Sequence, residues 1–486
     1  MRILVLNPPF KFRFDRSGRW HASPRGMSLW YPKWLAYTTG LLEREGHKVC
    51  FIDSTASKTN PMKELELRAK QFRPELVVCD SSTAGFSYEV GVCSKLKYTT
   101  GAKIVMVGTH VSALPEECLK YGNDVDFIAV GEYDFTILEL ANVLETGGNL
   151  KSVKGIVYRR GEDIIHNDLR PLIANLDDLP FVTEVYQRHL NISDYSLDFL
   201  LHPYVDLMCG RGCPYRCSYC LWPQTLMGRK YRTRSLDNIF LELDYILRTL
   251  NGIKEIFFDD DTFTANRNRI KEFCTRVIDD GYDFKWSLNC RPDVIDKELV
   301  NLMAKAGCRL AVVGYESGSQ QILDNVKKGT DIDSMRKFTK LFKSARIKIH
   351  GDFMIGLPGE TRETVQETIY LAKQIMPDTF QISIATPYPG TEFYSWLNDN
   401  SYLISSNFDE WLDEDGQQRC VISYPNLSAD EMKHIIKNAV TGYYLNPVYL
   451  FHASKVVLKD RDEFKRYAIG GKGFVKQLYR WHILRK

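Results

Sequence analysis

The sequence lacks an uninterrupted apolar run of the ~18 residues that a membrane-spanning helix requires. It also lacks an excess of either charge, because 64 Lys and Arg residues face 61 Asp and Glu residues and leave a formal net charge of +3. The opening MRILVLNPPF has a short apolar run and no small-residue cleavage site, so we expect a first strand there rather than a cleaved leader. With 44% hydrophobic and 26% charged residues, the composition predicts a cytoplasmic protein of roughly two to four domains.

Cysteine is scarce as well, with 12 in 486 residues. Eight stand singly, mostly in apolar runs, as expected of small buried side chains in a reducing compartment: Cys50, Cys79, Cys93, Cys118, Cys274, Cys290, Cys308 and Cys420. A disulfide framework is therefore not expected. The other four fall together in CGRGCPYRCSYC, residues 209–220, and this concentration points to chemistry.

From residue 1 to about 147, short β-branched runs alternate with helix-length amphipathic segments. Five strands separated by helices predict an open parallel sheet of the Rossmann-like α/β class, with right-handed crossovers. Ligands of such sheets bind beyond the carboxyl ends of the strands. Those ends read NPP, DST, DSSTAGFS, GTHVSALP and VGEYDFT, at residues 7–9, 53–55, 80–87, 108–115 and 130–136. They predict a ligand-binding rim, although turns alone would also be rich in these residue types.

Residues 148–200 lose this periodicity and are interpreted as a linker that includes a β-hairpin, GIVYRRGEDIIHND. Six further strand and helix repeats occupy residues 201–398 and predict a partial (β/α)6 barrel rather than a full eightfold barrel. Residues 399–486 predict a small helical C-terminal region that ends in a basic tail.

The basic tail runs from Lys455 to Lys486 and contains ten Lys or Arg residues and three Asp or Glu residues. Five aromatic residues are interleaved with them: Phe464, Tyr467, Phe474, Tyr479 and Trp481. Basic residues attract anionic lipids, and aromatic side chains favour the headgroup level of a bilayer. The tail is therefore either a solvated basic helix or a peripheral contact with the inner face of the membrane.

Cys213, Cys217 and Cys220 form the pattern C-x3-C-x2-C just after the first barrel strand, where barrel enzymes place their active sites. Thiolates flanked by arginines can ligate iron or zinc. Three cysteines would leave one iron of a [4Fe-4S] cubane open to the amine and carboxylate of S-adenosylmethionine. An electron from the cluster would then cleave a carbon–sulfur bond and release a 5′-deoxyadenosyl radical. The alternative is a closed zinc site completed by Cys209, although this crowded spacing is unusual for zinc.

This pattern at the head of a strand and helix series resembles the radical S-adenosylmethionine superfamily, and the N-terminal sheet resembles its cobalamin-binding branch, from residue 1 to about 400. FFDDDTF (257–263), NCRPD (289–293), VGYESG (313–318) and GDFMIGLPGET (351–361) match further segments of the family. The resemblance implies that the three cysteines hold the cluster. It also implies contacts with S-adenosylmethionine: Tyr219 and Gly356 near the adenine, Asp260 near the amine, Arg291 near the carboxylate, and Glu316 and Ser317 near the ribose.

MVGTHVSALPEE and DFIAVGEYDF are similar to segments of cobalamin-dependent radical enzymes. The resemblance implies that the rim of the N-terminal sheet binds cobalamin through Pro9, Ser82, Thr83, Gly108, His110, Gly131 and Glu132. His110 would lie near the nucleotide tail. The motif D-x-H-x-x-G is absent, so the lower face of cobalt would lack a protein ligand. A flavin-binding or phospho-receiver domain has the same strand order, and Asp53 could mimic a receiver aspartate.

The most specific resemblance is to the radical enzymes of hopanoid biosynthesis that contract a sugar ring, and it is carried by SLWYPKWLAY (28–37), DLPFVTEVY (178–186) and KYRTRS (230–235). It implies hydrogen abstraction from a sugar or polyol of a small-molecule or lipid-linked substrate, followed by rearrangement. C-methylation is the second hypothesis, and a non-catalytic cobalamin- or metal-responsive protein is the third. We expect flavodoxin or ferredoxin as electron donor and no nucleic-acid partner. Candidate pocket walls are Trp30, Trp222, Tyr315 and Tyr388.

Overall fold

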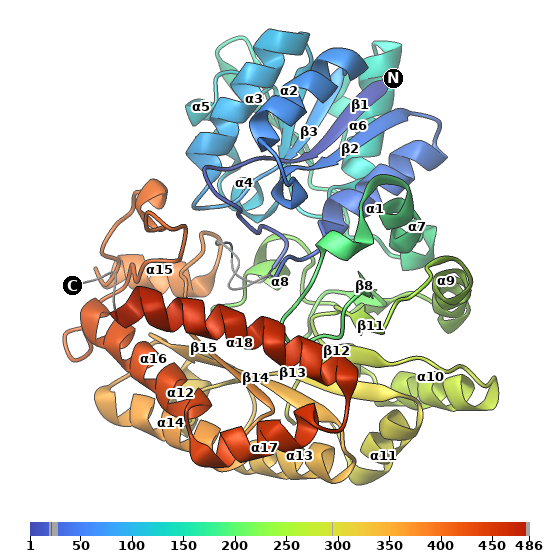
Figure 1. Ribbon diagram of the computed structural model, residues 1–486. Coiled ribbons are helices and arrows are strands. Elements are labelled where there is room, and N and C mark those ends of the chain that lie inside the picture. Colours follow the sequence, from blue (N-terminus) through green and yellow to red (C-terminus); the bar gives the residue numbers. More distant parts are fainter. Residues whose placement is uncertain (19–20, 22–27, 294, 483–486) are drawn as a thin grey trace.

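The computed structural model describes residues 1–18, 21, 28–293 and 295–482. The chain forms two sheets, each covered by helices, and a helical C-terminal region (Figure 1). In Figure 1 the N-terminal sheet lies at the top, and the second sheet lies below it with helix α18 across its front. The predicted fold class, a Rossmann-like sheet followed by a partial barrel and a small helical region, is confirmed.

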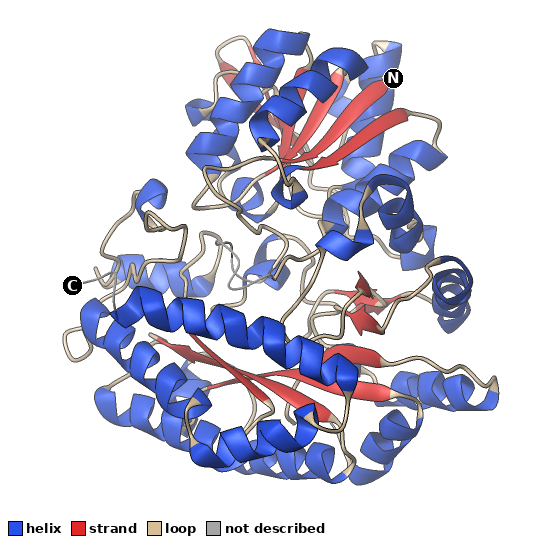
Figure 2. Cartoon of the chain, viewed as in Figure 1, coloured by secondary structure: helices blue, strands red, loops and turns tan. Residues whose placement is uncertain are grey.

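The N-terminal sheet has seven strands in the order β2-β1-β3-β4-β5-β6-β7. The first five are parallel: β1 (Arg2–Asn7), β2 (Lys48–Asp53), β3 (Leu76–Asp80), β4 (Lys103–Val107) and β5 (Phe127–Ala129). Helices cover both faces (Figure 2): α1 (Lys33–Arg44), α2 (Pro61–Phe72), α3 (Phe86–Thr100), α4 (Thr109–Ala113), α5 (Pro115–Tyr121) and α6 (Asp134–Thr146). In β1, Ile3 and Val5 belong to one hydrophobic core, and Leu4 and Leu6 belong to the other. Apolar side chains on both faces are typical of a parallel sheet enclosed by helices.

The predicted hairpin extends the N-terminal sheet. Strand β6 (Ile156–Arg160) pairs antiparallel with β5, and β7 (Asp163–His166) pairs antiparallel with β6. The sheet therefore continues past residue 147, where we had placed its end. The physical reason is that β5 is a three-residue strand whose outer edge would otherwise present unpaired backbone groups.

The second sheet has six parallel strands in the order β8-β11-β12-β13-β14-β15. They are β8 (Tyr204–Leu207), β11 (Glu255–Phe258), β12 (Trp286–Cys290), β13 (Cys308–Glu316), β14 (Lys348–Ile355) and β15 (Thr379–Ile384). The helices between them are α9 (Leu236–Thr249), α10 (Arg267–Asp279), α11 (Lys297–Lys305), α12 (Gln320–Asn325), α13 (Ile332–Ser344) and α14 (Arg362–Ile375). Because all six strands are parallel, their carboxyl ends meet at one rim.

Four helices follow the barrel: α15 (Glu392–Asp399), α16 (Ala429–Tyr444), α17 (Pro447–Val457) and α18 (Arg461–His482). The N-terminal part of α18 packs at the amino ends of the barrel strands, where the buried Glu463 pairs with Arg309 of β13 at 2.9 Å and with Lys348 of β14. Across the part of the chain that the structure describes, no helix combines the length and the apolarity needed to cross a bilayer.

Candidate active site

The three cysteines lie on the loop between β9 (Gly210–Arg211) and α8 (Leu221–Thr225), at the carboxyl end of β8. Cys217 is buried, whereas Cys213 and Cys220 are partly exposed. Within the described residues, no three His, Cys, Asp or Glu side chains converge on a single ion position. A cubane takes each thiolate at a different iron, so its ligands lie farther apart than those of one tetrahedral ion. The spacing of the three cysteines is what favours a cluster here.

The backbone of the cysteine loop is fixed by its neighbours. Gly212 has φ +90°, and a Cβ there would lie 2.2 Å from the carbonyl oxygen of Lys230, so only glycine fits this position. The facing strand is β10 (Arg232–Thr233), which pairs antiparallel with β9. Ser218 donates its backbone N–H to the carbonyl of Val326 at 3.0 Å. These contacts hold the loop in shape from both ends.

Cys209 lies apart from the cysteine loop. Its side chain is fully buried in the hydrophobic core, and burial raises the pKa of its thiol well above the usual value. Burial, with the nearby Asp261, also raises the pKa of Cys213, to about 11. The Cys209 thiol therefore stays protonated at neutral pH, whereas the Cys213 thiol would lose its proton on ligation of a metal ion.

A buried ionic group lies beside the cysteine loop. Lys328 Nζ contacts Glu316 Oε1 at 2.8 Å and the hydroxyl of Tyr219 at 3.4 Å. Burial lowers the pKa of Lys328, but Glu316 and Cys217 raise it more, so the net shift is upward and the side chain is a cation. Glu316 has φ +67°, which strains a non-glycine residue, and lies at a bulge between β13 and β14. The bulge directs the carboxylate toward the cysteine loop.

Arg291 also reaches the cysteine loop. Its guanidinium carbon lies 3.6 Å from the ring centroid of Tyr215, which is inside the C-x3-C segment. Its Nη2 donates to Asp293 Oδ2 and to the carbonyl oxygen of Lys328, both at 2.7 Å. Arg291, Lys328, Glu316 and Tyr219 therefore form one polar wall next to the three thiols.

Three other predicted S-adenosylmethionine contacts have partners within the protein. Asp260 accepts hydrogen bonds from Cys209 N–H and from the Tyr231 hydroxyl, both at 2.6 Å, and burial raises its pKa to about 7. Ser317 Oγ lies 3.1 Å from Thr368 Oγ1. Gly356 has φ +93°, and a Cβ there would meet Ile422 Cδ1 at 2.4 Å, so packing alone already requires glycine. Their roles toward the cofactor stay predictions.

A narrow cavity lies between the carboxyl edge of the N-terminal sheet and the cysteine loop, with about 10 Å³ of space open to a molecule the size of water. Both parts of the chain line it: Arg16, Ser17, His21, Pro32, Trp34, Leu35, Asp80, Ser81, Gly108, Thr109 and Tyr133 from the N-terminal part, and Trp222 and Leu226 from α8 and the residue after it. Trp34 and Trp222 stack with ring centroids 5.5 Å apart. Trp222 follows Cys220 by two residues, so the cavity and the cysteine loop share a wall.

Several buried polar atoms at these two places have no hydrogen-bond partner. Three of them belong to residues that line the cavity: Arg16 Nη2, His21 Nδ1 and Thr109 Oγ1. Three more lie in segments around the cysteine loop: Ser218 Oγ, Thr262 Oγ1 and Thr330 Oγ1. Leaving a buried polar group unpaired costs ~1–3 kcal/mol, so atoms of this kind mark places for polar ligand groups. The cavity residues therefore fit a ligand with many amide groups, such as cobalamin.

One of the predicted cobalamin contacts lines the cavity, and the others lie outside its lining. Gly108 lines the cavity and needs glycine, because its φ is +110° and a Cβ would lie 2.7 Å from Asp80 Oδ1. Pro9 and Thr83 are buried, and Ser82 Oγ donates to Glu89 at 2.6 Å. Glu89 in turn accepts from Arg16 Nε at 2.6 Å, so Ser82 supports a cavity residue.

The remaining rim residues have internal partners. His110 packs between Phe86 and Phe408, and burial lowers its pKa to about 3, which keeps the imidazole neutral. Gly131 donates its N–H to Ser112 Oγ at 3.1 Å. Glu132 forms two hydrogen bonds with Arg232 of β10, at 2.7 and 2.8 Å, and so joins the N-terminal sheet to the barrel side.

The structure also locates the alternative receiver aspartate and the four candidate residues for the walls of the substrate pocket. The carboxylate of Asp53, considered as a receiver aspartate, accepts from Asn7, Thr55 and Tyr195 at 2.7–3.0 Å. Trp222 lines the cavity, Tyr388 accepts a hydrogen bond from His21 N–H at 3.2 Å, and Trp30 packs against Phe199 and Phe257. Tyr315 as a wall is wrong, because its hydroxyl contacts Thr339 of α13 and its ring stacks on Phe353 in the core.

Sequence reasoning missed Arg16, Asp80, Lys328 and Tyr215. Burial raises the pKa of Asp80, which lines the cavity, to about 7. Asp80 lies inside the predicted rim and Tyr215 inside the cysteine pattern, so the sequence alone could have identified both as candidates. Arg16 and Lys328 stand outside those segments, and only the folded chain brings them to the site.

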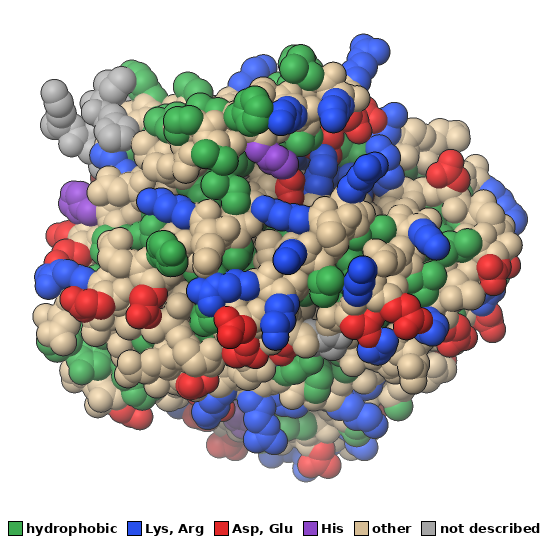
Figure 3. Space-filling model, turned by 90° about the horizontal axis from the view of Figure 1, so that it is seen from below, with side chains coloured by type: hydrophobic (Ala, Val, Ile, Leu, Met, Phe, Trp, Pro, Cys, Tyr) green, Lys and Arg blue, Asp and Glu red, His purple; other side chains and the backbone are tan. Residues whose placement is uncertain are grey.

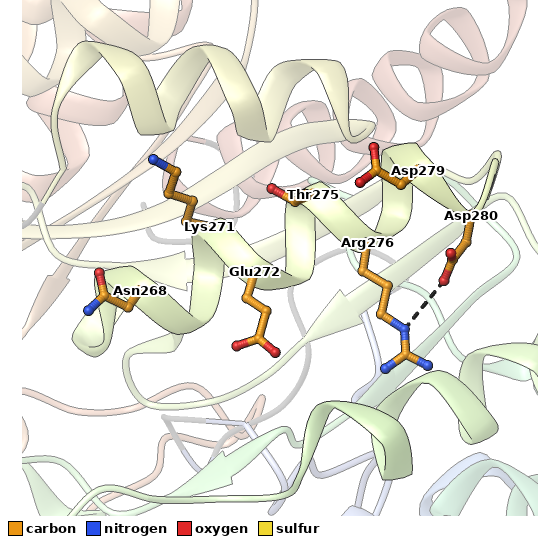
Figure 4. A pocket seen from close by; sticks show the side chains of 7 residues that line it. All are labelled: Asn268, Lys271, Glu272, Thr275, Arg276, Asp279 and Asp280. Carbon is orange, nitrogen blue, oxygen red and sulfur yellow. Dashed lines mark hydrogen bonds and ion pairs between the residues drawn. The ribbon is translucent and has the colours of Figure 1, made fainter.

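A separate surface hollow runs along α10 and is lined by Asn268, Lys271, Glu272, Thr275, Arg276, Asp279 and Asp280 (Figure 4). All seven side chains come from one helix and the residue after it, and Arg276 pairs with Asp280 at 3.3 Å. Asp237 of α9 pairs with Arg276 at 2.5 Å and Glu298 of α11 pairs with Lys271 at 2.9 Å, so the charged groups of this hollow are engaged in exposed surface ion pairs.

Two family models match the chain. The radical SAM superfamily model matches residues 207–372, and the B12 binding domain model matches residues 27–141. These ranges contain the cysteine loop and most of the cavity lining described above.

Individual proteins are similar over most of the chain. An uncharacterized methyltransferase of Pyrococcus horikoshii is 30% identical over 471 residues, which cover 96% of each chain. An anaerobic magnesium-protoporphyrin IX monomethyl ester cyclase of Cereibacter sphaeroides is 27% identical, over 76% of this chain and 61% of its own. Among solved structures, the radical S-adenosylmethionine methyltransferase TsrM of Kitasatospora setae, with cobalamin and a [4Fe-4S] cluster bound, has a TM-score of 0.69 at 18% identity and covers 92% of this chain and 89% of that chain.

Proposed function

Because the chain belongs to the cobalamin-binding radical S-adenosylmethionine enzymes, we propose that it catalyses C-methylation of a small-molecule substrate. The chain is an enzyme whose cofactors are a [4Fe-4S] cluster, S-adenosylmethionine and cobalamin. When bound, these groups would supply a radical that activates a carbon–hydrogen bond and the methyl group that is added. One observation supports the proposal: Trp222, two residues after Cys220, lines the cavity, so the two cofactors would lie next to each other.

Methylation replaces ring contraction as our first choice, because a methyltransferase is the relative that matches over 96% of both chains. Ring contraction, which the hopanoid-like segments had predicted, becomes the competing outcome of the experiment below. The non-catalytic alternative fails, because the chain is an enzyme of a known catalytic family.

On the cluster side, we assign Cys213, Cys217 and Cys220 as iron ligands. Lys328 holds the Glu316 carboxylate in place at 2.8 Å, and that carboxylate is positioned to accept hydrogen bonds from a ribose. Arg291 is buried and bridges Tyr215 and Asp293, which leaves its charge next to the thiolates. A guanidinium in this place suits the carboxylate of S-adenosylmethionine.

On the cobalamin side, we assign Arg16, His21 and Thr109 as donors or acceptors for amide groups, because each has an unpaired buried atom. His21 is neutral, since burial lowers its pKa to about 3. Gly108 allows the backbone to approach the ring closely.

For the substrate, we propose the inner face of strands β13 to β15. Val312, Gly314, Asp352 and Gln381 point to the same side of adjacent strands and keep partial exposure, whereas the alternate positions are buried. Asp352 Oδ1 lies 3.2 Å from His350 Nε2 and makes no hydrogen bond within the part of the chain that the structure describes, so this face offers an acceptor for a polar substrate.

For the electron donor, we propose an acidic protein such as flavodoxin or ferredoxin. A surface hollow next to the cysteine loop is lined by Pro214, Arg229, Lys230, Tyr231, Ala265, Asn266, Arg267 and Asn268. Pro214 directly follows Cys213, so a partner in this hollow would touch the loop. Three cations in the lining favour an acidic partner. Lys230→Glu should slow reduction by flavodoxin but not by dithionite, and Lys373→Glu, on the exposed side of α14, should slow neither.

The deciding experiment uses the anaerobically reconstituted holoenzyme with S-adenosylmethionine and a reductant. Methylation predicts S-adenosylhomocysteine together with 5′-deoxyadenosine, and methyl-labelled S-adenosylmethionine should place the label in a product formed from a small-molecule extract. Formation of 5′-deoxyadenosine without S-adenosylhomocysteine would refute methylation and favour rearrangement. Cys217→Ala should abolish 5′-deoxyadenosine formation in either case.

We also propose that the protein is cytoplasmic and attaches peripherally to the inner face of the membrane. The surface that would contact the membrane includes exposed residues of α17 as well as the basic tail.

A further inference from the structure

The exposed hydrophobic side chains of the described residues are concentrated near the C-terminus. Of 18 large hydrophobic side chains that are exposed, eight lie in one stretch of 35 residues: Leu445, Val448, Leu450, Phe451, Leu458, Phe464, Val475 and Tyr479. We call the outward side of α17 and α18, together with Leu445 before α17 and Leu458 after it, the C-terminal face. Scattered exposed hydrophobic residues are normal, but a cluster of this kind marks an interaction surface.

The hydrophobic side chains of α17 form a stripe. Val448, Phe451, Lys455 and Leu458 are spaced by three, four and three residues, so they lie along one side of the helix. Val448 and Phe451 are each 62% exposed, and Leu458 is 85% exposed. Lys455 Nζ lies 4.0 Å from the ring centroid of Phe451, so a cation is within the stripe itself. An apolar stripe with embedded lysine is typical of a helix that lies in a membrane interface.

The charge of the C-terminal face is of one sign. Six basic residues are exposed: Lys455, Lys459, Arg461, Lys465, Lys472 and Lys476. The three acidic residues between positions 445 and 479 are at least partly buried, and each pairs with a cation of the protein: Asp460 with Lys285, Asp462 with Lys254, and Glu463 with Arg309. Figure 3, seen from below, shows hydrophobic and basic side chains together along its upper margin, the side on which Figure 1 places α17 and α18.

The C-terminal face lies far from the cysteine loop. α17 packs at the amino ends of the barrel strands through His452 and Asp378 at 3.2 Å, and the N-terminal part of α18 packs there through Glu463 and Arg309. From Arg309 to Glu316, β13 spans seven residue steps, which is about 23 Å at ~3.3 Å per residue. An electron donor bound to this face would be too remote from the cluster. A lipid surface needs no such proximity.

We propose that the C-terminal face binds an anionic bilayer surface and holds the enzyme there, with its active site at the opposite end of the barrel. The exposed apolar side chains would insert into the headgroup region, and the six exposed cations would attract anionic lipid. The contact is an anchor and not an entrance for the substrate. This inference is independent of the reaction proposed above.

The test is flotation of the full-length holoenzyme with vesicles of phosphatidylcholine alone or with about one third phosphatidylglycerol. We expect flotation with the anionic vesicles, weak flotation with neutral vesicles, and release at high salt, because surface electrostatics are screened. Phe451→Glu combined with Leu458→Glu should lower binding more than tenfold. Tyr98→Glu, at a 94% exposed position on α3, is the matched control and should bind as the wild type does.

Other outcomes would overturn the proposal. No flotation, equal flotation with neutral vesicles, or equal loss in Tyr98→Glu would each do so. If a second copy of the chain covers this face instead, sedimentation analysis should show a dimer. The double variant Phe451→Glu with Leu458→Glu should then be a monomer. Formation of 5′-deoxyadenosine should be the same in all variants, which separates failure of the anchor from failure of the enzyme, and equal thermal unfolding confirms that the double variant is folded.

Discussion

Lys328→Met tests the polar wall beside the cysteine loop. Lys328 is 5% exposed, and its amine lies 2.8 Å from Glu316, which is 8% exposed. Two unit charges at this distance attract by roughly 6 kcal/mol at an effective dielectric constant of about 20, and desolvation opposes most of that gain. Removing one partner leaves the other charge buried, so we expect a loss of about 3 kcal/mol in the free energy of unfolding. Lys328→Met combined with Glu316→Gln should recover most of that loss, because no charge stays unpaired.

Activity should respond differently from stability. If Glu316 contacts the ribose, the double variant should be stable but should need a much higher concentration of S-adenosylmethionine to form 5′-deoxyadenosine. The measurements are denaturant unfolding of the reconstituted proteins and the rate of 5′-deoxyadenosine formation at several concentrations of S-adenosylmethionine. Wild-type stability in Lys328→Met, or wild-type kinetics in the double variant, would refute this reasoning. Glu316→Gln alone should raise the KM and change kcat less, since Lys328 stays in place.

Three further predictions concern the cysteines and the cavity. Cys217→Ala should lower the iron and sulfide content after reconstitution, whereas Cys209→Ala should leave both unchanged; equal loss would favour a site that includes Cys209. Asp80 has its pKa raised from 3.8 to about 7 by burial, so the folded state favours the protonated form and the wild-type protein without cobalamin loses stability as the pH rises through that range. Asp80→Asn should therefore stabilise this form by about 3 kcal/mol more at pH 8 than at pH 5, as measured by denaturant unfolding, and an effect independent of pH would contradict it. Gly108→Ala should cost roughly 3 kcal/mol and abolish the cobalamin absorbance of the reconstituted protein, whereas Gly101→Ala, with φ +73° and open space around it, should cost ~1 kcal/mol and keep the absorbance.

The fold could be predicted from the sequence because its signals are local. Alternating apolar runs gave five parallel strands and then six, and the structure has both sets. The exception was the hairpin β6–β7, which was recognised but assigned to a linker. Its place depends on the open edge of β5, a strand of three residues, and such pairing between strands is not visible in local periodicity.

The site could be predicted only where its residues lie in short patterns. The three cysteines within eight residues can be identified from their spacing, and Gly108 can be identified from its position after β4. Arg16 and Lys328 could not be found in this way, because each acts through a partner far along the chain: Arg16 pairs with Glu89 across 73 positions, and Lys328 reaches Tyr219 across 109. Glu132 shows the converse case, and its role toward cobalamin stays a prediction. It lies in a rim segment, but its carboxylate is bound by Arg232.

The hopanoid-like segments contribute mainly to the joint between the two sheets. In SLWYPKWLAY, Lys33 contacts Asp206 of β8 at 3.4 Å. In DLPFVTEVY, Tyr186 donates to the same Asp206 at 2.7 Å. In KYRTRS, Arg232 binds Glu132 of the N-terminal part.

Next to this joint, Arg211 pairs with Asp134 at 2.6 Å and stacks its guanidinium 4.5 Å from the ring of Trp34, which lines the cavity. Breaking a buried ion pair by removing one partner costs ~3–5 kcal/mol, so these contacts fix how the two cofactor sites face each other. Any enzyme that couples a radical at the cysteine loop to a group held by the N-terminal sheet needs that fixed geometry, whatever its substrate. The segments can therefore identify the family without specifying the reaction. This explains why they suggested ring contraction, although a relative that matches over 96% of the chain is named a methyltransferase.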